Sequence, residues 1–222
     1  MIFNKNSKTL TMKKALIIAA FVAALFITEK AQAQLNIHMG YSPELMTRMT
    51  PTYDTLFLYH GLCLGLDWTF VLKDNFSLSV GPQFRLNLRD VSKHYWSGAI
   101  YVHDLYRDRQ TLIDLPILLK YKFPVSDKFA ISPFAGPMLS CGIKGKTSRS
   151  ISFPLNTEQH YEWYGDDGYM KRFNVYGMVG VEMCFKRFTF SLGGRYGFLN
   201  LSKNTDETIK AYSFFINFGH SF

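Results

Sequence analysis

Residues 76–88, FSLSVGPQFRLNL, decide the fold because their character alternates along the chain. From Phe76 to Leu88 every second residue is apolar or a proline, and the residues between are small or polar and include Arg85. Successive side chains of a strand point to opposite faces. The stretch therefore predicts a strand that lies between an apolar and a polar environment.

Seven further runs alternate in the same way, which predicts eight strands in all. They are residues 35–42, 61–72, 113–123, 129–141, 173–185, 188–198 and 211–222. The run 129–141 is the least regular, because it contains Pro133 and Pro137 and proline weakens a strand. Most of the runs have the length of a tilted membrane-spanning strand, which needs about 9–11 residues.

The connections between these runs alternate strictly between short and long. The short ones are residues 73–75, 124–128 and 186–187, and the long ones are approximately 43–58, 89–110, 142–172 and 199–210. In an up-and-down barrel, this order places all short turns at one rim and all long loops at the other. The sequence therefore predicts an all-β, eight-stranded antiparallel transmembrane β-barrel with short periplasmic turns and long extracellular loops.

The charged residues of the strands gather on the face that also carries glycines and serines. They are Asp67, Arg85, Asp114, Lys120, Lys122, Glu182 and Arg195. A charge on the lipid face costs about 2–4 kcal/mol at the bilayer midplane. We therefore expect the aromatic-rich face in lipid and a charge network inside, where eight strands leave just enough room for side chains.

A water-soluble, lipocalin-like carrier is the alternative fold. It would turn the apolar face inward and the polar face to water. The polar face is rich in glycine and serine and has fewer lysines and glutamates than a solvent-facing sheet usually carries, which disfavours this alternative.

The start of the chain has the layout of a cleaved secretory signal peptide. Lys13 and Lys14 precede an apolar run of thirteen residues, 15–27, and the sequence Ala-Gln-Ala at 31–33 precedes Gln34. As a helix this run spans about 20 Å, less than the roughly 30 Å of a bilayer core. We expect residues 1–33 to be removed, residues 34–222 to form one domain, and Met1 or Met12 to be the initiator.

Composition excludes several kinds of site. The signal segment holds five lysines and one glutamate, so half of the formal charge of +8 lies outside the expected domain. No basic cluster indicates nucleic-acid binding. Cys63, Cys141 and Cys184 are too widely spaced for a disulfide framework or a zinc site. We expect no cofactor, no metal and no nucleic-acid partner.

Two segments resemble known outer-membrane proteins. The last strand, with Phe214, Ile216, Phe218 and Phe222, resembles the C-terminal strand that serves such barrels as an assembly signal, although His220 stands where an aromatic residue is commoner. Residues 113–123, IDLPILLKYKF, resemble a strand of the PorT-like outer-membrane β-barrel family. The resemblance implies an outer-membrane location, with membrane lipid and the barrel-assembly machinery as partners. It also implies a possible place in a secretion or envelope complex.

The long loops hold the candidate sites. Residues 142–172 carry an aromatic set that is a candidate surface for binding an extracellular macromolecule, namely Tyr161, Trp163, Tyr164 and Tyr169. The alternative is a loop that only covers the barrel mouth. In residues 89–110 the trio His103, Asp104 and Asp108 lacks the spacing of a metal site.

Three functions follow. The first is a non-enzymatic surface barrel with a binding or structural role, the second is a component of an envelope complex, and the third is a rim-active enzyme. For the enzyme, His94, His103 and His160 are candidate bases, but the sequence names no nucleophile and we assign no catalytic residue.

Deletion of Phe222 tests the C-terminal signal. We expect the shortened chain to reach the outer membrane in reduced amount, because the terminal aromatic residue of the last strand is lost. Fractionation of cells producing the two forms measures this amount, and equal insertion would contradict the assignment.

Overall fold

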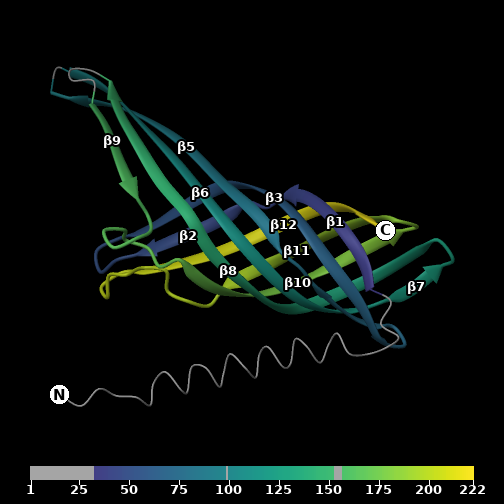
Figure 1. The fold of residues 1–222 in the computed structure, drawn as a ribbon. Helices are drawn as coiled ribbons and strands as arrows, with labels where there is room; N and C mark the ends of the chain where they lie inside the picture. The colour runs from purple at the N-terminus through teal and green to yellow at the C-terminus, as the bar shows by residue number, and fades with distance from the viewer. Residues whose placement is uncertain (1–32, 99, 153–156) are drawn as a thin grey trace, which may run out of the picture. The chain divides into compact units, whose positions relative to one another are not determined.

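Twelve antiparallel strands and no helix make up the part of the chain that the computed structural model describes, residues 33–98, 100–152 and 157–222 (Figure 1). The strands are β1 (Ala33–Tyr41), β2 (Glu44–Met49), β3 (Asp54–Lys73), β4 (Phe76–Val80), β5 (Gln83–Ser97), β6 (Ile100–Tyr121), β7 (Phe123–Ser126), β8 (Phe129–Ser152), β9 (Thr157–Glu162), β10 (Phe173–Phe185), β11 (Phe188–Gly197) and β12 (Thr208–Ser221).

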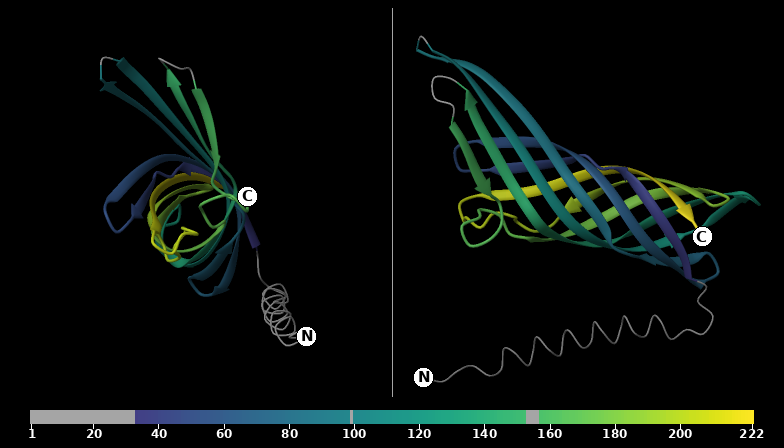
Figure 2. Two further views of the ribbon diagram at one scale, coloured as in Figure 1. Left: turned by 90° about the vertical axis from the view of Figure 1, so that its left-hand side faces the viewer. Right: turned by 45° about the horizontal axis from the view of Figure 1, so that its top comes forward.

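All twelve strands belong to one sheet, in which most neighbours in sequence are also neighbours in space. The order is β4-β6-β5-β3-β1-β12-β11-β10-β8-β7. Strand β6 also pairs with β8, β2 pairs with both β12 and β3, and β9 extends the sheet beyond β8. The first and last strands are paired antiparallel, with Met39 opposite Phe218. Viewed along their length, the strands curve around a shared interior (Figure 2).

Four of the twelve strands were not expected as separate elements. The sheet is interrupted at Pro43 and Pro82, where the missing N–H cannot join a ladder. It is also interrupted at Lys122, whose N–H donates instead to the carbonyl oxygen of Asn75 at 2.8 Å. Thus β1 and β2 both run along β12, β4 and β5 both run along β3 and β6, and β7 continues β6 along β8. The fourth extra strand, β9, forms within the expected loop 142–172.

Three of the expected long loops are largely strand. The expected loop 43–58 contains β2 and the start of β3. In the expected loop 89–110, β5 continues to Ser97 and β6 begins at Ile100, and in the loop 142–172 β8 continues to Ser152 and pairs with β9. We call the described residues of 89–109 and 144–162 the wing, because these strands project away from the rest of the sheet (Figures 1 and 2). The expectation of loops here was wrong, since cross-strand pairs such as Arg109–Asp90, 2.6 Å apart, hold the ladder together.

The short turns lie at the opposite end of the strands, which we call the turn end. Asp74 and Lys186 open two of these turns with φ of 50° and 55°. Positive φ at the first central residue is typical of the tightest hairpins, whose twist matches that of the strands. These turns fall within the expected short connections 73–75 and 186–187.

The two faces of the sheet differ sharply in exposure. On the outer face Leu64, Val179 and Phe214 remain 53%, 61% and 65% exposed. On the inner face Arg85 and Asp114 are fully buried. A lipocalin-like carrier would need the reverse arrangement, with its apolar residues inside, and the structure does not have it.

Residues 34–222 form one compact unit. The expected signal segment, residues 1–33, lies almost entirely outside the described residues. Among the described residues, no helix is long and apolar enough to cross a membrane.

Candidate functional site

Arg85 lies on the inner face between two carboxylates, one from the adjacent strand β6 and one from β2, which does not pair with β5. Its Nε donates to Asp114 Oδ2 of β6 at 2.8 Å, and its Nη1 donates to Glu44 of β2. All three side chains are almost completely buried. Buried charges are tolerated when they are paired and hydrogen-bonded, and here one guanidinium serves two acids.

A second arginine balances the charge of this group. Arg195 Nη1 of β11 lies 3.5 Å from Asp114 Oδ2, and its Nη2 donates to the hydroxyl of Ser42. Ser140 donates to the other oxygen of Asp114 at 2.5 Å. We call Glu44, Arg85, Asp114 and Arg195 the central network; its two arginines and two carboxylates have no net formal charge.

A separate group of charges lies nearer the turn end. Lys120 Nζ is 2.9 Å from Glu182 Oε2. Asp67 accepts hydrogen bonds from Asn36 at 3.1 Å and Ser79 at 2.9 Å, and its other oxygen lies 2.9 Å from His38 Nδ1. Six of the seven charges expected inside thus form two groups on the inner face.

Lys122 does not join either group. It is exposed where β6 gives way to β7, at the edge of a cavity of about 160 Å³ at the turn end. Its even number places it on the inner face, as expected. However, β6 ends at Tyr121, so Lys122 lies past the part of that face that is buried.

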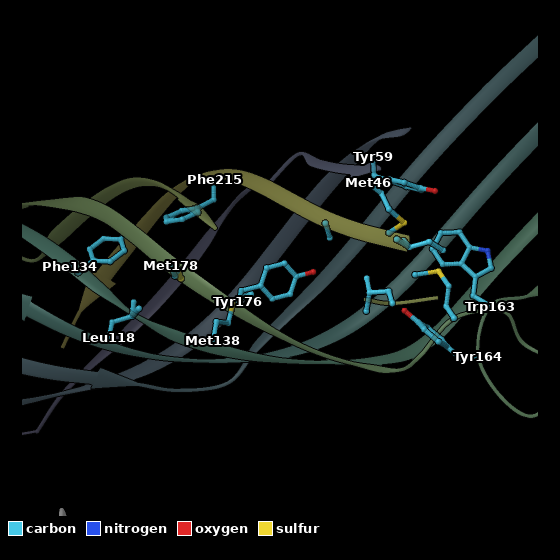
Figure 3. Close-up of a cluster of buried hydrophobic side chains, with 14 residues drawn as sticks. Met46, Tyr59, Leu118, Phe134, Met138, Trp163, Tyr164, Tyr176, Met178 and Phe215 are labelled. Atoms are coloured by element: carbon cyan, nitrogen blue, oxygen red, sulfur yellow. The ribbon is translucent and has the colours of Figure 1, made fainter. Parts of the chain in front are cut away.

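Bulky apolar side chains fill the inner face around the central network. Towards the turn end, Phe134 stacks with Phe215 at a centroid distance of 6.2 Å. Towards the wing, the edge of Tyr59 meets Trp163 at 5.9 Å. Figure 3 shows both groups of side chains directed into the same interior. Charged and apolar layers therefore alternate along the interior.

The aromatic residues expected to form a surface-binding patch divide into two pairs. Tyr161 and Tyr169 are exposed, whereas Trp163 and Tyr164 are only 1% and 8% exposed. Trp163 Nε1 donates to Thr147 at 2.8 Å, and Gln110 donates to the Tyr164 hydroxyl at 2.6 Å. Trp163 and Tyr164 therefore close the interior, so this part of the loop acts as the cover that was the alternative expectation.

A cavity of about 210 Å³ remains open beside this cover, and we call it the mouth. Its lining comes from β2, β3, β5, β6, β8, β12 and the loop after β9, and includes Arg48, Phe57, Tyr59, Arg89, Tyr106, Asp108 and Tyr169. The Arg89 guanidinium lies 4.6 Å from the centroid of the Phe57 ring and 2.7 Å from Asp108. An aromatic wall beside guanidinium groups favours planar or anionic ligand groups.

Ion pairs also hold the wing beyond the mouth. Arg149 donates to Asp104 at 2.7 Å, and this hydrogen bond lowers the pKa of the Asp104 carboxyl. On the other face, the hydrogen bond from Arg109 lowers the pKa of Asp90 in the same way. Both aspartates thus remain ionised over a wider pH range than free aspartate.

The three histidines proposed as candidate bases all lie on the wing. Ser92 Oγ is 2.7 Å from His103 Nε2 and 3.2 Å from His94 Nε2. His160 Nδ1 is 3.1 Å from Ser148 Oγ. Among the described residues no carboxylate contacts His94 or His103, so the third member of a catalytic triad is not found there.

The C-terminal strand presents its apolar residues outward. Phe214, Ile216, Phe218 and Phe222 are all exposed on the outer face, and β12 pairs with β1, β2 and β11. The strand expected to guide assembly therefore pairs with the first described strand, β1.

Glu44 of the central network, and Arg48, Phe57, Tyr59 and Arg89 of the mouth, were not expected from the sequence. Glu44 was assigned to the loop 43–58 because Pro43 ends the regular run. The even-numbered inward positions Ser42, Glu44 and Met46 nevertheless continue across the proline. This unbroken alternation of inward and outward residues was the signal that could have identified Glu44.

No family model matches the sequence, and no curated protein matches it. The PorT-like resemblance therefore stays a prediction.

Several solved structures are similar to this chain at low identity. Ail, the attachment invasion locus protein of Yersinia pestis, solved in complex with the heparin analogue sucrose octasulfate, is 11% identical, covers 86% of this chain and 99% of its own, and has a TM-score of 0.43. Neisserial surface protein A is 10% identical, with coverages of 85% and 97% and a TM-score of 0.41. The outer membrane protease OmpT of Escherichia coli is 11% identical, with coverages of 88% and 98% and a TM-score of 0.40. At these values the likeness does not choose between binding and catalysis.

Replacement of Arg85 by alanine tests the central network. The substitution leaves Glu44 and Asp114 buried without their shared partner, and we expect a loss of about 3–5 kcal/mol in the free energy of unfolding. Urea unfolding of the purified protein measures it. Arg109→Ala, which removes the exposed pair with Asp90, is the matched control and should cost about 1 kcal/mol or less. Equal losses in the two variants would show that burial of the network is not what matters.

Proposed function

We propose that this chain forms an eight-stranded β-barrel in the outer membrane, closed to ions, that binds an extracellular ligand at its mouth and wing. The observation that carries the membrane location is the exposed apolar outer face around a polar, charge-paired inner face. The binding role rests on the mouth cavity.

The pairings of the sheet support a closed barrel. Followed in order, they run from β1 through β12, β11, β10, β8, β6, β5 and β3, and β3 pairs again with β1. When β2, β4 and β7 are joined to the strands they continue, and β9 is assigned to the wing, eight strands remain. A closed barrel leaves no unpaired edge within the membrane, where an unsatisfied backbone group costs several kcal/mol.

The outer face supports a lipid environment. In water, so many exposed leucine, valine and phenylalanine side chains would form a patch far larger than monomeric soluble proteins carry. Lipid removes that cost, and the assembly machinery that recognises C-terminal strands is the expected first partner. On this proposal the turn end faces the periplasm and the wing faces the cell exterior.

The interior supports a protein that does not conduct ions. The central network, the Phe134–Phe215 layer and the Trp163–Tyr164 cover occupy successive levels of the interior. An eight-stranded barrel has just enough room for such side chains. We therefore assign no transport activity to it.

The mouth supports binding rather than catalysis. It combines aromatic faces with the guanidinium groups of Arg48 and Arg89, the chemistry that recognises carboxylate, phosphate or sulfate groups. Arg48 is paired with Glu207 and Arg89 with Asp108, so an anionic ligand would have to share or replace these carboxylates. The Ser92–His103 contact lies on the exposed wing without an orienting carboxylate. We therefore propose a non-enzymatic protein, and the structure gives no feature that assigns it to a secretion complex.

Fractionation and gel mobility test the proposal together. We expect the protein in the outer-membrane fraction, and we expect its folded form to migrate differently from the boiled form in detergent gels. Reconstituted into planar bilayers, it should give no stable channel conductance. A soluble periplasmic protein without a mobility shift would contradict the barrel, and steady conductance would contradict the sealed interior.

An arginine placed on the outer face tests the lipid contact directly. Val179 lies at the middle of β10 and is exposed, so Val179→Arg should reduce the free energy of unfolding in phospholipid vesicles by about 2–4 kcal/mol. Trp96→Arg, on the wing, is the control and should change it by about 0.5 kcal/mol or less. If both substitutions are tolerated equally, the outer face is not in lipid.

A further inference from the structure

Two histidines face each other across the β5–β6 hairpin of the wing. His94 and His103 are directly opposite in the ladder. Their rings are stacked, with centroids 4.5 Å apart and planes only 3° from parallel. His94 also stacks on Tyr101 at 5.8 Å, which in turn contacts Trp96. The aromatic neighbours thus limit the directions that the two imidazoles can take.

The imidazole nitrogens of this pair converge on one point. His103 Nε2 and His94 Nε2 lie 2.7 Å and 3.2 Å from the same atom, Ser92 Oγ. The cross-strand position thus places the same nitrogen of each imidazole beside one hydroxyl, although the lone pairs of two stacked rings run parallel. Rotation of the two side chains out of the stack would let both nitrogens reach one ion at about 2.0–2.1 Å, the usual distance from imidazole to zinc.

We propose that His94 and His103 bind a late divalent transition-metal ion such as Cu²⁺ or Zn²⁺. Imidazole is the commonest metal-binding side chain and suits both of these ions. Among the described residues no three His, Cys, Asp or Glu side chains converge. The site therefore provides two nitrogen ligands, and water or the Ser92 hydroxyl completes the coordination.

The other histidines do not offer this arrangement. His38 is half-buried against Asp67, and His60 bonds to the Tyr41 hydroxyl. His220 packs edge-on against Phe188 and Phe222. His160 lies on the same wing but has Ser148 and Glu158 as its partners, and no second imidazole. It is therefore a matched control on the same part of the molecule.

A bound ion would link β5 to β6 near the far end of the wing. The two strands already form a long ladder, and a metal bridge would hold the hairpin more firmly where it projects furthest. This site is separate from the mouth and does not depend on the membrane proposal, because it uses only residues of the wing.

Metal titration of the full, refolded chain in detergent, purified without a histidine tag, tests the site. We expect isothermal titration with ZnCl₂ to show one equivalent bound. His94→Ala and His103→Ala should each weaken binding by at least about tenfold, the loss seen when even an outer partner of a metal ligand is removed. His160→Ala should bind as the original protein does.

Electron paramagnetic resonance with one equivalent of Cu²⁺ gives a readout that does not depend on any variant. Two coordinated imidazole nitrogens are expected in the spectrum. Gel mobility before and after boiling shows that each variant is folded. Unchanged zinc affinity in His94→Ala or His103→Ala, loss of binding in His160→Ala, or a copper spectrum without two imidazole nitrogens would each overturn the proposal.

Discussion

The pairing of Arg85 with Glu44 and Asp114 is the interaction on which the proposed barrel depends. An eight-stranded barrel has no room for a water-filled channel, so every charge on its inner face needs a partner from another strand. Arg85 comes from β5, Asp114 from the adjacent strand β6, and Glu44 from β2, which pairs with neither, so the network links strands across the interior. Because the two acids and two arginines of the central network neutralise one another, the inner face can bury charged side chains. The apolar side chains of the strands can then lie on the outer face.

The same constraint explains what the sequence predicts well. The contrast between lipid and interior repeats every two residues, so simple parity identifies the inward position of Arg85, Asp114 and Lys120 without knowledge of the fold. The odd or even number of a residue does not say where a strand ends. For this reason Lys122 was expected on the inner face, although it lies exposed just after the end of β6. Parity also failed at Glu44, since Pro43 interrupts the ladder while the alternation of faces continues through it.

The wing could not be predicted because the residues of its two faces do not differ in character. From Arg89 to Arg109 both faces carry polar and aromatic side chains, so the pattern lacks the hydrophobic contrast that marks a strand. The strands form there through cross-strand pairs such as Arg109 with Asp90 and through stacked rings. Likewise, nothing local in the sequence distinguishes the buried Trp163 and Tyr164 from the exposed Tyr161. Trp163 and Tyr164 are buried because the curved sheet leaves space between its strands where these side chains fit. That space is set by the whole sheet and not by the local sequence.

The distribution of chemistry along the molecule separates its structural groups from those available to a partner. Inside, His38 is bound to Asp67, Lys120 to Glu182, and the guanidinium of Arg85 to two acids. These groups already have their partners and can accept another only by giving one up. At the mouth and on the wing, by contrast, aromatic faces and the imidazole pair of His94 and His103 are within reach of solvent. A ligand of the kind we propose would therefore approach from the side of the wing, where these aromatic and imidazole groups are exposed.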